Sequence, residues 1–283
     1  MPELPEVEIM CRNLARWCGG RTVGAVELID PRLVKDHPDL NPVVGLVVGE
    51  VRRRGKYATV HLADPRVDQA DGPTAAREWV LVLHFRMTGK VVLDDGAAGR
   101  RVRLRLHLKG SGPPTVVFDD RRCLGEVWLI ENADLEMFFT SRKLGPEPWP
   151  MPRGGAWWSG RLKGSRGPLK TVLMDQHRVA GLGNIAASEI LWLARLSPFD
   201  TASDLALADW DRLADSVPRF IDRVLQTESG DEVYFVQHGG SNNFAVYQRA
   251  DQPCLRCATP VARRVQSGRS TFWCPQCQPE RPH

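Results

Sequence analysis

The sequence has 283 residues, of which 42% are hydrophobic, and this predicts about two globular domains with cores of their own. Its 38 basic and 34 acidic residues give a net charge of +4, which is too weak a balance to indicate a nucleic-acid partner by itself. No apolar run approaches ~18 residues, and no charged stretch followed by an apolar one opens the chain, so we expect a soluble protein without a membrane span or signal peptide.

The chain opens with Met1-Pro2-Glu3-Leu4-Pro5-Glu6-Val7-Glu8. Removal of Met1 would leave Pro2 as a terminal secondary amine, which can attack an electrophilic carbon and form an iminium. An α-amino group has a pKa of roughly 7.7–8.0, so part of it is neutral and nucleophilic near pH 7. Glu3 beside it is a candidate acid. The same residues also suit a plain helix start, because Pro5 fits a first turn and Glu6 favours its positive end. The two interpretations are compatible.

Eight β-branched segments follow and predict strands. Between residues 101 and 108, apolar and basic residues alternate strictly, which predicts a strand with one buried face and one basic face. So many short strands favour an antiparallel sandwich or barrel. Residues 63–78 have no periodicity and predict a solvent loop. The strands are expected at residues 23–29, 43–54, 57–62, 79–86, 90–93, 102–108, 115–118 and 126–130.

The character of the sequence changes at residues 144–150, where three prolines in five residues predict a linker. Helical patterns at 169–177 and 186–196 then flank the glycine-rich stretch 179–184. A third helix is expected through residues 210–224, with Pro218 kinking or restarting it. The glycine-rich stretch alone is either a plain turn or a phosphate site at a helix N-terminus.

The strongest local motif is a pair of Cys-x-x-Cys sequences near the C-terminus. Four thiolates at this spacing fit one tetrahedral zinc, and no open position remains for catalysis, so the zinc is expected to be structural. This cysteine usage indicates a reducing compartment instead of a disulfide framework. Strands are expected at 261–266 and 270–273, with Arg269 in the turn between them. The predicted zinc ligands are Cys254, Cys257, Cys274 and Cys277.

These motifs together resemble the formamidopyrimidine-DNA glycosylases of the Fpg/Nei family, and the resemblance covers nearly the whole chain. It rests on residues 2–8, on the turn at 181–184, on the cysteine pairs and on Gly268-Arg269-Ser270-Thr271. It implies a base-excision enzyme that removes oxidised purines, namely 8-oxoguanine and formamidopyrimidines, and cleaves the strand by β,δ-elimination. Pro2 would form the Schiff base, Glu3 would donate and shuttle the proton, and Lys56 would be a supporting cation.

The resemblance also implies a set of DNA contacts. Phosphate ligands are expected at Lys56, Lys170, Asn184 and Arg269. The segment His84-Phe85-Arg86-Met87-Thr88-Gly89 resembles the one whose methionine enters the gap left by an extruded nucleotide, although a methionine there is otherwise core filler. In Asp120-Arg121-Arg122-Cys123-Leu124-Gly125, the family's arginine and phenylalanine correspond to Arg122 and Leu124, with Arg121 a competitor for the first role.

The chain departs from the family pattern at two places that concern the lesion. Leu124 lacks the aromatic face that stacks on bases. Residues 229–243 do not show the pattern of the loop that closes over the flipped base in oxoguanine-specific members. A Nei-like enzyme acting on oxidised pyrimidines therefore stays an alternative. A zinc-ribbon DNA-binding protein without catalysis is a more remote one.

The sequence thus predicts an α+β multidomain protein. We expect a catalytic β-sandwich domain with a leading helix at 1–140, a linker at 141–152, a helix-two-turn-helix DNA-binding domain at 153–247 and a zinc-finger domain at 248–283. The expected partner is double-stranded DNA with damaged bases or abasic sites. The protein is expected to be a monomer in the bacterial cytoplasm, associated with the nucleoid.

Overall fold

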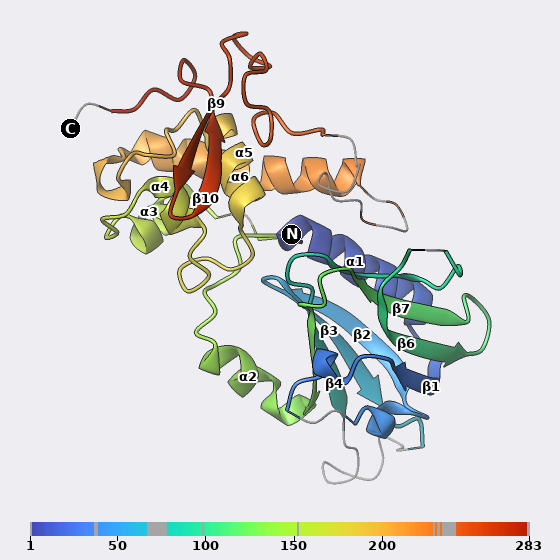
Figure 1. Cartoon of the computed structure of the whole chain (residues 1–283). Helices are drawn as coiled ribbons and strands as arrows, with labels where there is room; N and C mark the ends of the chain where they lie inside the picture. Colours follow the sequence, from blue (N-terminus) through green and yellow to red (C-terminus); the bar gives the residue numbers. More distant parts are fainter. Residues whose placement is uncertain are drawn as a thin grey trace. The chain divides into compact units, whose positions relative to one another are not determined.

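The computed structural model describes residues 2–36, 39–66, 78–97, 99–151, 153–228, 230, 233 and 242–281 (Figure 1). The chain divides into two compact units, Met1–Arg142 with Glu228–Val233, and Lys143–Thr227 with Tyr234–His283. Most of the predicted loops at 63–78 and 229–243 lies outside the described residues.

The first unit is a helix packed on antiparallel strands, as the sequence predicts. Helix α1 (Leu4–Cys18) buries its apolar stripe, including Val7, Met10 and Leu14. All eight predicted strands are present. They are β1 (Thr22–Leu28), β2 (Val47–Arg54), β3 (Tyr57–Ala63), β4 (Trp79–His84), β5 (Gly89–Leu93), β6 (Val102–Lys109), β7 (Thr115–Asp120) and β8 (Glu126–Glu131), with short 3-10 turns η1 (Pro31–Leu33), η2 (Asn41–Val43) and η3 (Asn132–Asp134).

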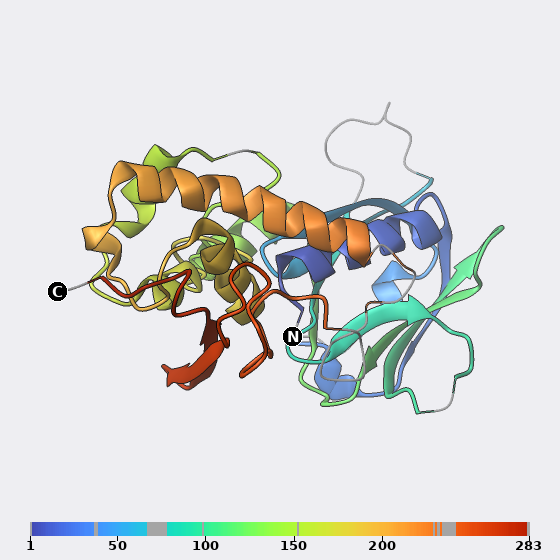
Figure 2. The same ribbon diagram turned by 90° about the horizontal axis from the view of Figure 1, so that it is seen from above.

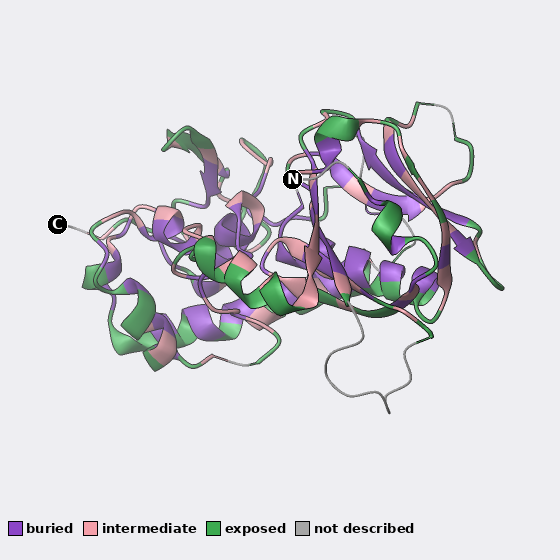
Figure 3. Ribbon diagram, turned by 90° about the horizontal axis from the view of Figure 1, so that it is seen from below, coloured by how far each residue is buried: buried purple, intermediate pink, exposed green. Residues whose placement is uncertain are grey.

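The strands are hydrogen-bonded in the order β5-β7-β6-β1-β2-β3-β4-β8. A single residue pair, Thr22 with Val47, joins β1 to β2, so the sheet divides into two four-stranded halves. Helix α1 packs against β2 and β3 of one half and β5 of the other. Figure 3 shows buried, purple residues on the helix and on the strands of this unit, and β7 is buried along its whole length.

Strand β6 differs from its prediction at one residue. Arg103 belongs to the face that was expected to be basic and solvated, yet its side chain is 1% exposed. A register shift between Val102 and Leu104 interrupts the strict alternation. Arg103 tolerates burial because it pairs with Asp30 and Asp120.

Helix α2 (Leu135–Ser141) was not expected, because seven residues are too few to show a helical period. Phe138 and Phe139 of this helix meet the ring of Tyr57 edge-on, with centroids 6.1 and 5.6 Å away. Phe138 also contacts Trp128 at 5.3 Å. Tertiary packing of aromatic rings therefore holds a helix that local propensity does not announce.

The second unit is helical and ends in a β-hairpin. Helices α5 and α6 pack on each other, α3 packs on α6, and α5 contacts β10. Their core contains the fully buried rings of Trp158, Trp210 and Phe220. The elements are α3 (Gly155–Leu162), α4 (Leu169–Leu173), α5 (Asn184–Ala194), η4 (Ala202–Asp204), α6 (Leu207–Thr227), β9 (Ala262–Gln266) and β10 (Arg269–Trp273). None of the described helices has the length and apolar character needed to cross a bilayer.

Three predicted boundaries in this unit are corrected. Helix α6 runs unbroken through Pro218, so the expected restart is wrong (Figure 2). The apolar face around Val217 and Ile221 is buried along the whole helix, and this packing outweighs the one lost backbone hydrogen bond. Helix α4 ends at Leu173 instead of continuing to residue 177. Arg269 is the first residue of β10 and follows the two-residue turn Ser267-Gly268, so it does not lie in the turn itself.

Candidate functional site

The N-terminal turn of α1 places Pro2 and Glu3 in a buried position. Glu3 is the N-cap, and its backbone N–H donates to Glu6 Oε2 at 2.8 Å while its side chain accepts from the backbone N–H of Glu6. This reciprocal pair is a capping box, which fixes the direction in which the chain enters the helix. Glu6 thereby holds the residue that follows Pro2.

The Glu6 carboxyl is itself titratable near neutral pH. Burial raises its pKa from 4.5 to about 7, and the nearby charges of Glu3 and Glu228 add to the effect. Burial also raises the pKa of Glu228 to about 6. Because desolvation disfavours the charged form of a carboxyl, Glu6 holds a proton for part of the time at pH 7. The turn therefore combines a candidate amine with two carboxyls, one of which exchanges its proton in the physiological range.

Lys56 and His84 belong to the same unit, Lys56 directly before β3 and His84 at the end of the neighbouring strand β4. Lys56 is half-buried in the turn between β2 and β3, and Tyr57 after it pairs with His84 across β3 and β4. Burial lowers the pKa of His84 to about 3, with contributions from Arg86 and Lys56. The imidazole is therefore neutral at pH 7, and its Nδ1 accepts the backbone N–H of Arg86 at 3.3 Å. His84 cannot supply positive charge to a phosphate, although a hydrogen bond remains available to it.

The two turns predicted to enter the gap in DNA are neighbours. Met87 is half-buried between β4 and β5, and the segment 121–125 connects β7 to β8. Gly89 pairs with Asp120 in the β5–β7 ladder, so the Met87 turn ends beside the point where the second segment begins. Arg121 and Arg122 are both exposed, and Leu124 is 43% exposed. The backbone N–H of Arg122 donates to Thr88 Oγ1 at 3.1 Å, which ties this arginine to the residue after Met87.

In the second unit, Lys170, Asn184 and Arg269 gather around Ser270. Lys170 is 1% exposed, and its Nζ donates to Ser270 O at 3.1 Å and Thr271 Oγ1 at 2.8 Å. Asn184, the first residue of α5, donates from Nδ2 to the same carbonyl at 3.1 Å. Arg269 precedes Ser270 and is exposed. The structure therefore joins the helix-turn-helix segment to the hairpin, and it gives Lys170 a buried partner that the sequence did not suggest.

The turn before α5 is built as the glycine pattern requires. Gly181 has a φ of +90°, a backbone conformation that other residues rarely adopt. Gln176 holds the turn by accepting from Gly181 N at 2.9 Å and donating to Leu182 O at 2.6 Å. The N-terminal amides of α5 are thus presented next to Asn184 in a fixed geometry, which is the arrangement that binds a phosphate.

The four predicted zinc ligands converge. Their sulfur atoms all lie within 4.8 Å of one another. Three of the separations are 4.0, 3.4 and 3.4 Å, whereas sulfurs on a tetrahedral zinc with Zn–S of ~2.3 Å stand about 3.8 Å apart. Trp192 Nε1 donates to Cys254 Sγ at 3.4 Å, and the backbone N–H of Cys277 donates to Cys274 Sγ at 3.4 Å. Such donors favour the thiolate form, so the site fits one structural zinc ion.

Several buried charges that support these elements were missed. Glu189 is fully buried in α5 and accepts backbone N–H groups from Ala245, Val246 and Tyr247 at 2.8 to 3.0 Å. Arg103 and Asp120 are equally buried beneath the segment 121–125. The available signal was a charged residue inside an otherwise apolar segment, which in a folded protein must find a partner.

Known proteins share these features along the whole chain. The family models for the formamidopyrimidine-DNA glycosylase N-terminal domain, its H2TH domain and the zinc finger found in FPG and IleRS match residues 1–127, 144–234 and 251–279. The formamidopyrimidine-DNA glycosylase of Streptococcus mutans is 31% identical over 98% of this chain and 99% of its own length. That of Synechocystis sp. is 35% identical over 99% of both chains.

A solved structure of the same kind agrees with the fold. Wild-type Lactococcus lactis Fpg, crystallised with DNA containing an oxidised pyrimidine, superposes with a TM-score of 0.83 at 27% identity, covering 98% of this chain and 100% of that one. The superposition extends over the N-terminal domain, the H2TH domain and the zinc finger, so one known architecture covers the chain. The chain belongs to the formamidopyrimidine-DNA glycosylase family.

Proposed function

We propose that this protein is a DNA glycosylase and abasic-site lyase that removes oxidised purines, 8-oxoguanine and formamidopyrimidines, from double-stranded DNA. The observation that carries the proposal is the buried N-terminal turn, in which Pro2 is followed by the capping-box carboxyls of Glu3 and Glu6. Membership of the glycosylase family supports it. A turn that served only to begin a helix would have no need to bury two carboxyls beside the terminus.

In this mechanism, removal of Met1 exposes the Pro2 amine, which attacks C1′ of the damaged nucleotide. The glycosidic bond breaks, the base leaves with a proton, and opening of the deoxyribose ring gives an iminium between Pro2 and C1′. Glu3 donates the proton to the ring oxygen. Loss of the C2′ proton then expels the 3′ phosphate, loss of the C4′ proton expels the 5′ phosphate, and water hydrolyses the iminium. Glu6 holds Glu3 through its backbone and stores a proton near pH 7.

The remaining predicted residues take roles in holding DNA. Lys56 is a supporting cation, Asn184 and Arg269 hold phosphates, and Lys170 acts through the Ser270 carbonyl and Thr271 hydroxyl that it binds. Met87, Arg122 and Leu124 fill the gap of the extruded nucleotide, and His84 contacts DNA as a neutral donor or acceptor. The functional division at 1–140, 141–152, 153–247 and 248–283 follows this assignment. We further propose that the protein works as a monomer in the cytoplasm on nucleoid DNA.

The terminal amine is tested by covalent trapping. Borohydride should link the wild-type protein to a duplex with an abasic site, because it reduces the iminium to a stable amine. Pro2→Gly carrying an N-terminal tag should give no adduct, since its terminal amine lies far from the turn. The matched control is the wild-type sequence with the same tag at its C-terminus, and it should be trapped as efficiently as the untagged protein. Equal trapping by the N-tagged variant would refute the Pro2 mechanism.

A second lesion class deserves the same assay. Leu124 is exposed and has no aromatic ring, so the side chains that fill the gap do not depend on stacking against DNA bases. An oxidised pyrimidine is therefore a second substrate to test. Excision from a panel of duplexes, each with one oxidised purine or pyrimidine, separates the two substrate classes. A protein that binds every duplex but neither excises nor traps would be the non-catalytic zinc-ribbon binder.

A further inference from the structure

Asp120 occupies the centre of a buried hydrogen-bond network beneath the Met87 turn and the segment 121–125. The side chains of Met87, Arg122 and Leu124, which these two turns carry, are called the wedge. Its side chain is fully buried, and each carboxylate oxygen accepts two hydrogen bonds. Oδ1 accepts from the Thr88 hydroxyl at 2.5 Å and the Arg122 N–H at 3.2 Å. Oδ2 accepts from the Gly125 N–H at 2.6 Å and Arg103 Nη1 at 3.3 Å. One carboxylate thus binds the residue after Met87 and both ends of the segment 121–125.

Thr88 connects the turns a second time. It is 7% exposed, and its Oγ1 accepts the Arg122 N–H while its hydroxyl hydrogen goes to Asp120. The residue directly after Met87 therefore provides the oxygen, Thr88 Oγ1, that also holds the backbone of Arg122. A valine at position 88 would fill the same volume without making either hydrogen bond.

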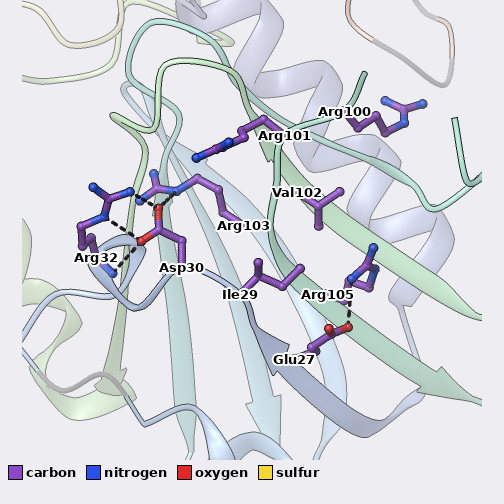
Figure 4. Close-up of a pocket in the computed structure, with 9 residues that line it drawn as sticks. All are labelled: Glu27, Ile29, Asp30, Arg32, Arg100, Arg101, Val102, Arg103 and Arg105. Atoms are coloured by element: carbon purple, nitrogen blue, oxygen red, sulfur yellow. Dashed lines mark hydrogen bonds and ion pairs between the residues drawn. The ribbon is translucent and has the colours of Figure 1, made fainter. Parts of the chain in front are cut away.

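Arg103 anchors the network to the rest of the sheet. Its Nη1 also donates to Gly125 O at 3.0 Å, and its Nε donates to Asp30 Oδ2 at 3.1 Å. Asp30 in turn accepts three hydrogen bonds from Arg32, two from its guanidinium and one from its backbone N–H, and these hold the pKa of that carboxyl below its usual range (Figure 4). The figure shows Arg32 and Arg103 meeting at Asp30 on one side of an arginine-lined pocket. Two carboxylates therefore balance the buried guanidinium.

Two residues next to the wedge side chains have a left-handed backbone conformation, which is unfavourable for residues other than glycine. Arg86, which precedes Met87, has a φ of 52°, and Cys123, between Arg122 and Leu124, has a φ of 53°. Left-handed conformations in residues other than glycine are strained and persist where the surroundings over-determine them. The Asp120 network supplies that constraint at both turns. Gly125 allows the close approach, since a Cβ there would lie 2.6 Å from the Phe118 ring.

We propose that Thr88, Asp120 and Arg103 are positioning residues that hold the Met87 turn and the Arg122–Leu124 segment as a single preformed wedge. This rests on the proposed function, in which those side chains enter the gap left by an extruded nucleotide. A wedge that is already ordered stabilises the extruded state without a further ordering cost when DNA binds. The hydrogen bonds given above for this network lie within the first unit, and we expect the network to contribute to extrusion and not to the elimination chemistry.

The experiment compares Thr88→Val with the wild type on two substrates. The first is a duplex with one excisable lesion, from which the base must be extruded. The second is single-stranded DNA with an abasic site, where no stack has to open. Thr88→Val should slow duplex excision about tenfold, the scale set by one lost hydrogen bond to a carboxylate, and leave single-strand cleavage nearly unchanged. Met87→Ala, which removes the wedge itself, should show the same selectivity.

Two variants separate positioning from general stability. Thr88→Ser keeps the hydroxyl and should restore duplex excision. Thr59→Val makes the same chemical change at another buried threonine of this unit, whose hydroxyl donates to Arg52 O at 3.2 Å, and should not alter the ratio of the two rates. Equal slowing of Thr88→Val on both substrates, or no slowing, would overturn this inference while leaving the proposed function intact. A wild-type protein inactive on all lesions and on abasic DNA would overturn both.

Discussion

Glu6→Gln should change how the stability of the protein depends on pH. In the folded protein the pKa of Glu6 is about 7, against an ordinary value of 4.5. The folded state therefore binds this proton more tightly than the unfolded chain, and stability falls as pH rises from 4.5 to 7. The difference of 2.5 in pKa, at about 1.36 kcal/mol each, corresponds to about 3 kcal/mol lost above pH 7. Glutamine cannot ionise, and its amide oxygen can still accept the Glu3 N–H.

The assay is urea unfolding of the two proteins at several pH values between 4.5 and 8. The free energy of unfolding of Glu6→Gln minus that of the wild type should increase by about 3 kcal/mol across this range. Taking the difference removes the contribution of His84, whose lowered pKa makes stability fall as pH drops below 6.5 in both proteins. Glu136→Gln makes the same change at an exposed site of α2 and is the matched control, whose difference serves as the baseline. A flat difference for Glu6→Gln as well would show that Glu6 is already ionised at pH 5, and the proton-storing role would be abandoned.

The metal and the phosphate contacts lead to two further predictions. The wild type should contain one zinc per chain, and a metal-free wild type would contradict the site. Cys274→Ala should lose the zinc and expose residues beyond about 249 to proteolysis while the first unit stays folded. The control variant Cys123→Ala should retain the metal. Arg269→Ala should weaken binding to damaged and undamaged duplex equally, and it should reduce the salt dependence of DNA affinity by about 0.9 in slope without loss of stability. Lys170→Ala should weaken binding in the same way and also destabilise the hairpin, because its buried ammonium binds Ser270 and Thr271. A purely lesion-specific loss would refute either assignment.

The sequence was sufficient for elements whose physics is local. The cysteine spacing predicted the metal centre because each short Cys-x-x-Cys turn can present two sulfurs to one metal ion, and two such turns supply four ligands. The eight strands followed from their β-branched composition, and the start of the first helix from Pro5 and Glu6. The candidate amine was predicted from the position of Pro2 alone, directly after Met1. Its assignment to a reaction came from the resemblance to a family.

Properties that depend on burial were decided only by the tertiary structure. Arg103 was expected on a solvated basic face, but Asp30 and Asp120, 73 and 17 residues away along the chain, turn it into a buried anchor. Lys170 looked like a free phosphate ligand, yet it binds the hairpin 100 residues later. The pKa of Glu6 depends on the burial of its carboxyl and on Glu228, neither of which residues 2–8 specify. Charge positions can be read from a sequence, but their energies depend on solvent exclusion and on partners that only the folded chain brings within a few ångströms.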